Sequence, residues 1–428
     1  MSFTEWDWSP PRSPPLGDHE VPLLSNHLQG RRIALVVCGG IAALKAPELA
    51  RALRRRGARV TAFCSQEALR YVGLEALEWA CEQPVIRDLS WRAEHLSDSE
   101  PFDAWLVAPA TYNTIGKLAA GVADTVVTAA LASALGRLGQ GRTQILVAPT
   151  MHGSLHTPLL ERNGRLLQQL GVRFITPRDA YGKHNLPAAE LLVAAVCRAV
   201  STSALVGRRL LVTGGPTPVP LDGVRAIVNR FRGRLGAAIS EELLLRGAEV
   251  RFVLGDGGWR PPSWLPYTLA SSYDDYRRLT LEAVSGGLEA GIFSAAVADY
   301  RPRHPVAGKI ASGLGHLQLE LEPTEKVIEL VRAADPALVM VSFKVMQGVS
   351  TEELIATARR RLGPSQLVVA NRAEDVQGEE QTAWIVDAEG AQRVQGKGAI
   401  AAALADRLEG MLGQPKDLKT LRPKDLKS

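Results

Sequence analysis

The feature that most constrains the fold is a short pattern that occurs near the start of each half of the chain. An apolar run ends in a pair of glycines, a segment with apolar residues at helical spacing follows, and a second apolar run comes next. The first copy spans 31–65 and the second spans 207–255. Short apolar runs that alternate with helical segments are typical of parallel strands buried on both faces. The pattern therefore predicts one mainly parallel sheet in each half.

The same alternation continues through both halves. Helices are predicted over 113–135, 188–200, 354–362 and 400–412, and strands over 104–111, 143–151, 291–300, 337–344, 366–371 and 381–390. Strands that alternate with helices belong to the α/β class, in which an open sheet carries helices on both faces. We therefore expect an α/β protein with two doubly wound, Rossmann-like domains.

The 428-residue chain is long enough for more than one domain, and we expect four segments. Residues 1–30 are rich in proline and lack a periodic apolar pattern, which predicts a disordered arm. Residues 31–203 and 204–413 predict the two α/β domains. Residues 414–428 form a basic tail that contains the sequence PKDLK twice, and we expect this tail to be disordered as well.

Composition excludes several classes of protein. No apolar run is long enough to span a membrane, and the first residues lack the pattern of a secretory signal. The net charge of +5 is spread over the whole chain, which does not predict a nucleic-acid-binding surface. Four irregularly spaced cysteines without a CxxC pair favour a reducing, cytoplasmic location.

A glycine-rich loop opens the second half at residues 212–236. The predicted strand ends in glycines, and the next helix begins near Gly233. Ligands of open α/β sheets bind beyond the carboxyl ends of the strands, where glycine turns and helix N-termini offer N–H groups to phosphates. Arg225, Arg230 and Arg232 add guanidinium groups suited to phosphate. Neither standard dinucleotide fingerprint is present, so a generic Rossmann-like loop stays an alternative at this point.

These residues resemble the opening motif of phosphopantothenate–cysteine ligases. The residues that match are Thr213, Gly215, Thr217, Pro220, Asp222, Val224, Arg225, Ile227, Asn229, Arg230, Gly233 and Gly236. Later matches follow in the family's order at 294–302, Lys309, 342–344 and 368–371. Several motifs in the right order make this resemblance specific.

The resemblance implies an activity and a set of site residues. Ligases of this family activate the carboxylate of 4′-phosphopantothenate with CTP and Mg²⁺, and the amine of cysteine then displaces CMP from the acyl-cytidylate. Cations and Mg²⁺ offset the charge of such species. The resemblance implies two catalytic residues in this half: Asn229, which contacts the acyl-cytidylate, and Lys309, which contacts the triphosphate. The implied nucleotide and substrate contacts are Gly215, Arg225, Arg230, Ala295, Asp299, Phe343 and Lys344.

The first half resembles flavin-dependent cysteine decarboxylases, which implies a flavodoxin-like domain with FMN as its cofactor. The resemblance rests on the first glycine turn, on Ser65 and on a close match over 108–128. In the turn, Gly40 stands where the family usually has serine. The implied FMN-binding residues are Gly39, Gly40, Ile41, Ala42, Ser65, Ala108, Pro109, Ala110, Thr111, Asn113 and Thr114.

The decarboxylase motifs are incomplete. His95 lies at the distance expected for the family's catalytic histidine. His152 occupies the place of an asparagine, and the flap region 177–190 has no cysteine, although the family uses both groups. A histidine does not reproduce the donor and acceptor of a carboxamide, and the proton donor of the last step is missing. His152 and His156 are four residues apart without an evident third ligand, so the sequence does not predict a zinc site.

Together, the two halves resemble the bifunctional decarboxylase–ligases of coenzyme A biosynthesis. Three alternatives stay open: a bifunctional enzyme, a ligase with a structural or regulatory flavin domain, and a non-catalytic flavin-binding module. The partners expected are small-molecule substrates, with neither nucleic acid nor membrane. The resemblance also implies a homo-oligomer with trimers of the flavin domain and dimers of the ligase domain. The sequence leaves the protein ligands of any metal open.

Overall fold

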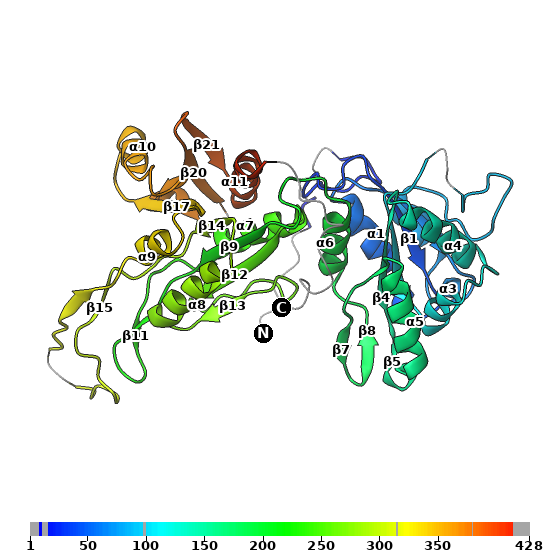
Figure 1. Cartoon of the computed structure of the whole chain (residues 1–428), viewed down its shortest axis with the longest axis horizontal. Coiled ribbons are helices and arrows are strands. Elements are labelled where there is room, and N and C mark those ends of the chain that lie inside the picture. The colour runs from blue at the N-terminus through cyan, green and yellow to red at the C-terminus, as the bar shows by residue number, and fades with distance from the viewer. Residues whose placement is uncertain (1–7, 11–15, 97–99, 314–315, 379, 414–428) are drawn as a thin grey trace. The chain divides into compact units, whose positions relative to one another are not determined.

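The computed structural model describes residues 8–10, 16–96, 100–313, 316–378 and 380–413. The chain forms two compact units, and the boundary between them falls between Val200 and Ser201. We call them the N-terminal and the C-terminal unit and describe each by itself (Figure 1). Both PKDLK repeats lie outside the described residues.

The N-terminal unit is built on five parallel strands in the order β2-β1-β3-β4-β6. The strands are β1 (Arg32–Val37), β2 (Arg59–Cys64), β3 (Ala104–Ala110), β4 (Gln144–Pro149) and β6 (Arg173–Phe174). β1 and β3 are almost completely buried, as expected for central strands covered on both faces. This order is that of flavodoxin-like sheets, so the prediction of a doubly wound α/β domain is confirmed.

Helices cover both faces of this sheet (Figure 1). They are η1 (Ile41–Lys45), α1 (Ala46–Arg54), η2 (Ala68–Arg70), α2 (Leu74–Cys81), α3 (Tyr112–Ala119), α4 (Val126–Gly139), η3 (Gly153–Leu155), α5 (Pro158–Gln169) and α6 (Ala189–Val200). The single helix predicted over 113–135 is wrong, because α3 and α4 are separate. Gly121 adopts a left-handed conformation after α3, and Thr125 begins α4 with a capping box.

Part of the proline-rich segment also packs on the N-terminal unit, although we expected residues 1–30 to be disordered. Val21 and Leu28 are buried. The N–H of Leu28 donates to the carbonyl of Arg56 at 2.8 Å, and that of Leu24 donates to the carbonyl of Arg55 at 2.8 Å. Burial of two apolar side chains therefore orders residues 16–30, which the proline content had not indicated.

A small antiparallel sheet follows β4. β5 (Met151–His152) pairs with β8 (Lys183–Asn185), which forms a hairpin with β7 (Arg178–Ala180). We call β7 and β8 the flap hairpin, since they lie within the region that the resemblance identified as the flap. The hairpin turns at Gly182, whose carbonyl accepts the N–H of Gly153 at 2.9 Å.

The C-terminal unit contains one large sheet in the order β13-β12-β9-β14-β17-β18-β20-β19, with β21 paired to β20. Its strands are β9 (Arg209–Gly214), β12 (Glu249–Gly255), β13 (Thr268–Ala270), β14 (Ala290–Phe293), β17 (Val339–Met346), β18 (Leu367–Arg372), β19 (Val376–Gln377), β20 (Glu380–Val386) and β21 (Ala391–Gln395). The strands from β13 to β18 run parallel, and β19, β20 and β21 add an antiparallel edge. The predicted, mainly parallel sheet is therefore confirmed here as well.

The helices of the C-terminal unit are α7 (Arg234–Leu245), α8 (Tyr273–Ser285), α9 (Val327–Ala334), α10 (Thr351–Arg359), η4 (Ala373–Asp375) and α11 (Lys397–Leu412). One core lies between the sheet and α7 and α11, and another between the sheet and α8 and α9. Among the described helices, none combines the length and the apolar character needed to cross a bilayer.

Two hairpins extend from the sheet of the C-terminal unit (Figure 1). One consists of β10 (Val219–Pro220) and β11 (Ala226–Ile227), and the other of β15 (Tyr300–Pro302) and β16 (Leu321–Pro323). β10 contacts β15, so the hairpins lie side by side, and we call them together the arm. The strand predicted over 291–300 ends at Phe293, because the chain leaves the sheet there on its way to β15.

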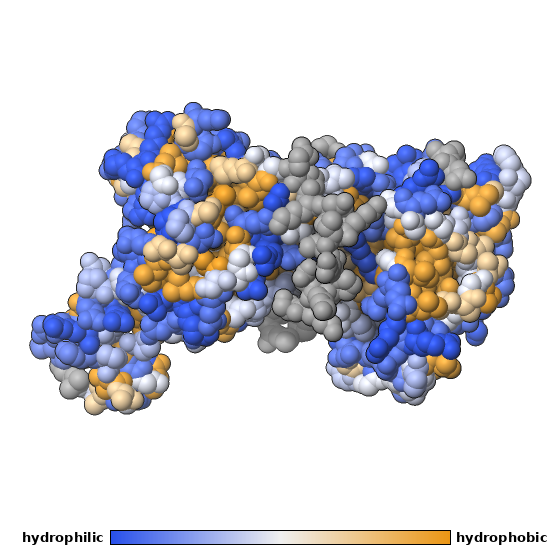
Figure 2. Space-filling view, in the orientation of Figure 1, coloured by the Kyte–Doolittle hydropathy of each residue, from blue (hydrophilic) through white to orange (hydrophobic). Residues whose placement is uncertain are grey.

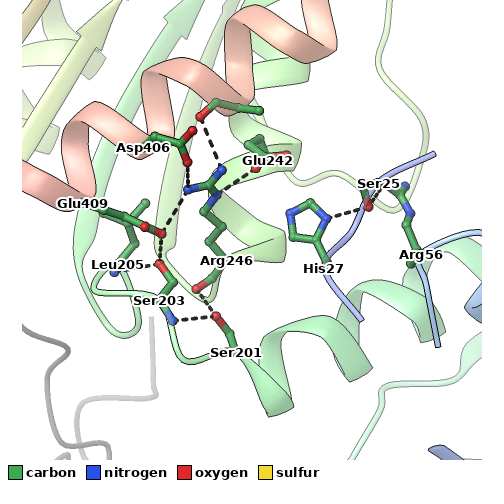
Figure 3. Close-up of polar contacts among 11 residues, drawn as sticks. Ser25, His27, Arg56, Ser201, Ser203, Leu205, Glu242, Arg246, Asp406 and Glu409 are labelled. Carbon is green, nitrogen blue, oxygen red and sulfur yellow. Dashed lines mark hydrogen bonds and ion pairs between the residues drawn. The ribbon is translucent and has the colours of Figure 1, made fainter. Parts of the chain in front are cut away.

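A polar network ties the two helices of the first core together (Figure 3). The guanidinium of Arg246, at the end of α7, binds Asp406 of α11 at 2.6 Å and Glu242 at 2.8 Å. Glu409 of α11 also accepts the hydroxyl of Ser203, at the start of the unit. Burial alone lowers the pKa of Arg246. The hydrogen bonds that its guanidinium donates to Asp406 and Glu242 outweigh burial and hold the pKa above its ordinary value. The guanidinium therefore stays charged.

Candidate functional site

The C-terminal unit has a cavity of about 1150 Å³ beyond the carboxyl ends of its central strands. Gly215 directly follows β9, and residues 294–299 follow β14. β17 contributes residues 342–345, and β18 contributes Asn371. The carboxyl ends of neighbouring parallel strands meet at one edge of the sheet, which is where open α/β sheets bind ligands. The fold therefore gathers segments from four strands around this cavity.

Two glycines let the floor of the cavity pack closely. Gly215 has φ +76°, and a Cβ there would lie 2.6 Å from the carbonyl oxygen of Gly255. Gly233, with φ +83°, precedes α7, and its Cβ would lie 2.7 Å from the backbone nitrogen of Gly215. Both conformations and both contacts require glycine. The close approach brings the N-terminus of α7, with its exposed N–H groups, to the cavity wall.

The cavity is strongly basic. Its lining includes nine basic and only three acidic side chains, a balance of +6. The basic residues are Arg230, Arg232, Arg234, Lys326, Arg332, Lys344, Arg360, Arg361 and Lys397, and the acidic ones are Asp299, Glu325 and Glu329. Three of the nine were singled out in the sequence: Arg230 and Lys344 as binding residues, and Arg232 as a further guanidinium suited to phosphate. Motif spacing gave no signal for Lys326 or Lys397, because they come from segments far apart in the sequence. This charge suits a ligand with several negative charges.

The loop between β14 and β15 is fixed in place over the cavity. The N–H of Ala298 donates to Thr217 at 2.8 Å, and the hydroxyl of Thr324 donates to the carbonyl of Ala298 at 2.6 Å. Asp299 forms an ion pair with Lys326. The predicted residues Ala295 and Asp299 therefore line the cavity on a rigid loop, together with Gly215, Arg230, Phe343 and Lys344.

Asn229 lies beside the cavity lining. Its Nδ2 donates to the carbonyl oxygen of Ala296 at 3.0 Å, while the next residue, Arg230, is part of the lining. The side chain is exposed, so its carboxamide oxygen is open to a ligand. The structure thus places Asn229 next to the other predicted residues of this site.

Arg225 and Lys309 lie on the arm and are not part of the cavity lining. Arg225 donates to the carbonyl of Ile310 at 2.7 Å, and the N–H of Gly223 donates to the carbonyl of Gly308 at 3.0 Å. Within one chain, therefore, the structure does not bring these two predicted residues together with the rest of the nucleotide site. Hydrogen bonds between the two hairpins hold these residues on the arm, and the order of the motifs in the sequence does not reveal these bonds.

Asp222 organises the arm. Its buried carboxylate accepts the N–H groups of Val224 at 2.8 Å, Arg225 at 2.6 Å and Ile310 at 3.1 Å. Burial by itself raises the pKa of Asp222, but these N–H groups and the charge of Arg225 outweigh burial and hold the pKa below its ordinary value. Asp222 is therefore a charged link between the two hairpins.

In the N-terminal unit, the loops after β1 and β3 face each other at the point where the strand order reverses. A Cβ on Gly40 would lie 3.6 Å from Cγ2 of Thr111. A Cβ on Gly39 would lie 2.4 Å from Cβ of Glu67, so only glycine fits there. In flavodoxin-like sheets this switch point holds FMN. The predicted loop 39–42 and Thr111 therefore lie together at this switch point, which we call the crevice.

Several of the other predicted FMN residues have structural roles. Ala108, Pro109 and Ala110 are buried within β3, so their side chains pack in the sheet. Thr111 caps α3 by accepting the N–H of Thr114 at 3.3 Å, and Thr114 is itself buried. Ser65 accepts the N–H of Ala68 at 3.2 Å after β2. Asn113 and Ile41 are exposed at the crevice loops, where a ligand can reach them.

Cysteines do not supply a reactive thiol in this unit. Burial raises the pKa of Cys38 to about 11, and it raises the pKa of Cys64 and of Cys81 to about 12. A thiol with such a pKa is neutral at physiological pH and is a poor nucleophile. The missing flap cysteine is therefore not replaced by any of these three.

The two histidines singled out in the sequence lie in different surroundings. His95 is in the loop between α2 and β3, and its Nδ1 is buried without a hydrogen-bond partner among the described residues. Such a nitrogen is available to a polar group of a ligand. His152 is exposed on β5, where its Nδ1 accepts the N–H of Ser154 at 3.1 Å and caps a short helical turn.

A hydrogen-bonded string of side chains was not anticipated from the sequence. Nδ1 of His156 lies 3.0 Å from Nε2 of His184, and Nδ1 of His184 lies 2.6 Å from Oδ1 of Asp179. Nε2 of His156 lies 3.5 Å from Oε1 of Glu161. We call these four residues the histidine string. The described residues contain no group of three or more His, Cys, Asp or Glu side chains arranged to hold a metal ion.

Comparisons with known proteins agree with this division. The family model described as "Flavoprotein" matches residues 23–201, and the one described as "DNA/pantothenate metabolism flavoprotein C-terminal domain" matches residues 205–411. The coenzyme A biosynthesis bifunctional protein CoaBC of Thermococcus kodakarensis is 36% identical over 413 residues, which cover 92% of this chain and 100% of the relative.

The protein of the same name from Bacillus subtilis is 30% identical over 362 residues, which cover 80% of this chain and 86% of the relative. Among solved structures, the DNA/pantothenate metabolism flavoprotein from Streptococcus pneumoniae is 26% identical with a TM-score of 0.44, and the match covers 48% of this chain and 100% of that one.

Proposed function

Because the chain belongs to the family of coenzyme A biosynthesis bifunctional proteins, we propose that it carries out two steps of this biosynthesis. The C-terminal unit joins 4′-phosphopantothenate to cysteine, with CTP as cosubstrate and an acyl-cytidylate as intermediate. The N-terminal unit decarboxylates the product, 4′-phosphopantothenoylcysteine, to 4′-phosphopantetheine with FMN as cofactor.

The observation that carries the ligase activity is the basic cavity at the carboxyl edge of the large sheet. A nucleoside triphosphate and a phosphorylated acid bring several negative charges to one place, and nine basic side chains surround that place. The N-terminus of α7 adds N–H groups suited to phosphate. Asn229 is suited to orient the acyl-cytidylate, since its Nδ2 is anchored on Ala296 and its oxygen is open.

Mg²⁺ fits such a site without a dedicated cage of side chains. This ion usually binds one or two carboxylates together with phosphate oxygens of the substrate and water. Asp299, Glu325 and Glu329 are the carboxylates that line the cavity. We propose that Mg²⁺ enters with the triphosphate, and that Lys344 offsets the charge that develops as the carboxylate attacks.

FMN fits the crevice between the loops after β1 and β3. The residues that would hold it are the backbone of 39–42, the side chain of Asn113 and the exposed face of Ile41. When bound, FMN would accept two electrons as the cysteinyl thiol is oxidised and return them after CO₂ has left, as the resemblance to flavin-dependent cysteine decarboxylases implies. His95 has an unpartnered nitrogen, so it is a candidate for holding the substrate in this unit.

We also propose that the protein is a homo-oligomer in the cytoplasm. The arm exposes apolar side chains, including Val224 at 71% and Val306 at 46%, and Figure 2 shows apolar residues at its tip. A second copy that covers this surface is the expected reason for the exposure. All four cysteines are free and buried, in keeping with a reducing compartment.

The decisive experiment incubates the purified protein with 4′-phosphopantothenate, cysteine, CTP and Mg²⁺, and follows CMP and the products by mass spectrometry. Formation of CMP and 4′-phosphopantetheine is the expected result. Accumulation of 4′-phosphopantothenoylcysteine would support the ligase and reject the decarboxylase. Failure to release the monophosphate from any nucleoside triphosphate would reject the ligase and favour a non-catalytic flavin-binding protein.

A further inference from the structure

The histidine string is the group of titratable side chains outside the predicted sites that has the most organised geometry. Asp179 is on β7, His184 is on β8, Glu161 is in the first turn of α5, and His156 lies in the short segment between η3 and α5. The side chain of His184 is only 19% exposed, whereas that of His156 is 50% exposed. The string thus runs from a shielded imidazole to one that solvent or a ligand can reach.

The hydrogen bonds of the string accommodate one transferable proton. Asp179 accepts from Nδ1 of His184, which fixes the orientation of that ring. With hydrogen on Nδ1 of both rings, His156 donates to Nε2 of His184, and His184 donates to Asp179. A proton delivered to Nε2 of His156 would lie within ion-pair distance of Glu161, whose Oε1 is 3.5 Å away. Arg165, 3.6 Å from Glu161, is the cation that faces the outer end.

The string lies at the edge of the sheet that carries the flavin crevice. The N–H of Thr150, just before β5, donates to the carbonyl of Ala110 at the end of β3. The hydroxyl of Tyr112, next to Thr111, lies 3.2 Å from that of Thr157, next to His156. His184 is paired with Met151 in the strand register. The flap hairpin therefore holds the two imidazoles next to the loop that borders the crevice.

The decarboxylation proposed above requires a proton. The bond between the cysteinyl α-carbon and its carboxylate breaks, CO₂ leaves, and a C–H bond forms at the same carbon. FMN, when bound, would take up and return two electrons, so the overall reaction is neutral in electrons and consumes one proton. Cys38, Cys64 and Cys81 are buried thiols with raised pKa values and are unsuited to this task.

We propose that the His156–His184 pair, oriented by Asp179, delivers this proton and does the work for which the flap would otherwise need a cysteine. His156 is the outer donor, and His184 replenishes it. The inference rests on the proposed decarboxylase function of the N-terminal unit.

The test supplies 4′-phosphopantothenoylcysteine directly to the flavin-loaded full chain and measures 4′-phosphopantetheine. We expect His156→Gln and His184→Gln each to lower the rate about 100-fold, in the range of general acid catalysis. Imidazole in the buffer should restore part of the rate to His156→Ala, because this side chain is half exposed. His19→Gln, on the surface of the same unit with its ring against Trp79, is the matched control and should keep the rate.

A second measurement does not depend on turnover. Nitrogen-15 NMR of the imidazoles in the flavin-free protein should show His184 with hydrogen on Nδ1, and His156→Gln should alter the His184 signals. Circular dichroism and FMN binding report that the N-terminal unit of each variant is folded. A wild-type protein that forms no 4′-phosphopantetheine overturns both the decarboxylase function and this inference. A wild-type protein that does, with histidine variants of equal rate or without imidazole rescue, overturns the inference alone.

Discussion

At the scale of single residues, close backbone approach decides which glycines the sites need. Gly39 and Gly40 are neighbours in the same turn, yet only Gly39 lies so close to Glu67 that there is no room for a Cβ. The sequence pattern treats the two alike. A Cβ at position 39 would lie 2.4 Å from Cβ of Glu67, which forces a shift. A Cβ at position 40 would lie 3.6 Å from Thr111, which is an ordinary contact.

We therefore expect Gly39→Ala to displace the loop after β1 and to lower the affinity for FMN at least tenfold. Its free energy of unfolding should fall by about 1–3 kcal/mol, as for other overpacked sites. Gly40→Ala is the control and should bind FMN nearly as well as the wild type. Flavin fluorescence titration measures both, and equal affinities for the two variants would contradict the assignment of the crevice.

Lys344 tests the basic cavity. It comes from the end of β17 and lines the cavity without an ion pair among the described side chains. We expect Lys344→Ala to reduce kcat/KM for CTP about 100-fold, as loss of a charge near a transferring group does. Arg303→Ala, on the exposed arm and paired with Glu320, is the matched loss of a cation outside the cavity. Steady-state kinetics of both variants make the comparison. Equal losses of kcat/KM in Lys344→Ala and Arg303→Ala would argue against specific binding of CTP in the cavity.

At the scale of elements, the arm depends on one buried carboxylate. The pKa of Asp222 is lower in the folded arm than in an unfolded chain, where it is about 3.9. The contacts of this carboxylate therefore stabilise the arm fully above the pKa of the unfolded chain. The stabilisation is lost only as the pH falls through the lower pKa of the folded arm. Hydrogen exchange should show protected amides at Val224 and Ile310 at neutral pH.

The corresponding variant is Asp222→Asn. We expect it to lose this protection at neutral pH and to change little between pH 6 and pH 3, while the wild type loses protection only in acid. Asp274→Asn, at the exposed start of α8, should leave exchange in the arm unchanged. Unaltered protection in Asp222→Asn at neutral pH would show that the two hairpins hold together without this carboxylate.

The pair of helices α7 and α11 depends on Arg246. Its side chain is 15% exposed, and truncation removes the cation that contacts Glu242 and Asp406. We expect Arg246→Ala to lower the free energy of unfolding by about 3 kcal/mol. Arg278→Ala, which removes an exposed ion pair with Glu282 on α8, should leave the free energy of unfolding nearly unchanged. Urea denaturation of both variants makes the comparison, and similar losses would contradict it.

At the scale of the whole molecule, each unit has its own sheet and its own core. Each also matches a separate family model. The basic cavity is lined by residues of the C-terminal unit alone, and the flavin crevice by residues of the N-terminal unit alone. Such units should fold and function separately.

We expect a fragment of residues 1–203 to bind FMN, and a fragment of residues 204–428 to release CMP with 4′-phosphopantothenate, cysteine and CTP. The rate of the second fragment should lie within threefold of that of the full chain, measured at the same protein concentration. Chromatography and circular dichroism establish that the fragments are folded. A folded second fragment that releases no CMP would show that the ligase needs the N-terminal unit.

The sequence by itself determined the class of fold and much of the site. Periodicity identified the parallel strands, because strands buried on both faces must be continuously apolar. The resemblance to ligase motifs predicted Gly215, Arg230, Asp299 and Lys344 as binding residues, and all four line the basic cavity. These features depend on neighbours in the sequence, so they can be predicted from it.

Only the tertiary structure decided the rest. Lys326 and Lys397 line the cavity, whereas Lys309 and Arg225 lie on the arm. Contacts between segments far apart in the chain set these positions. His156 and His184 meet because the flap hairpin pairs with β5, and no local pattern encodes that pairing. Long-range packing and buried hydrogen bonds set these positions, and they depend on all the elements that surround them.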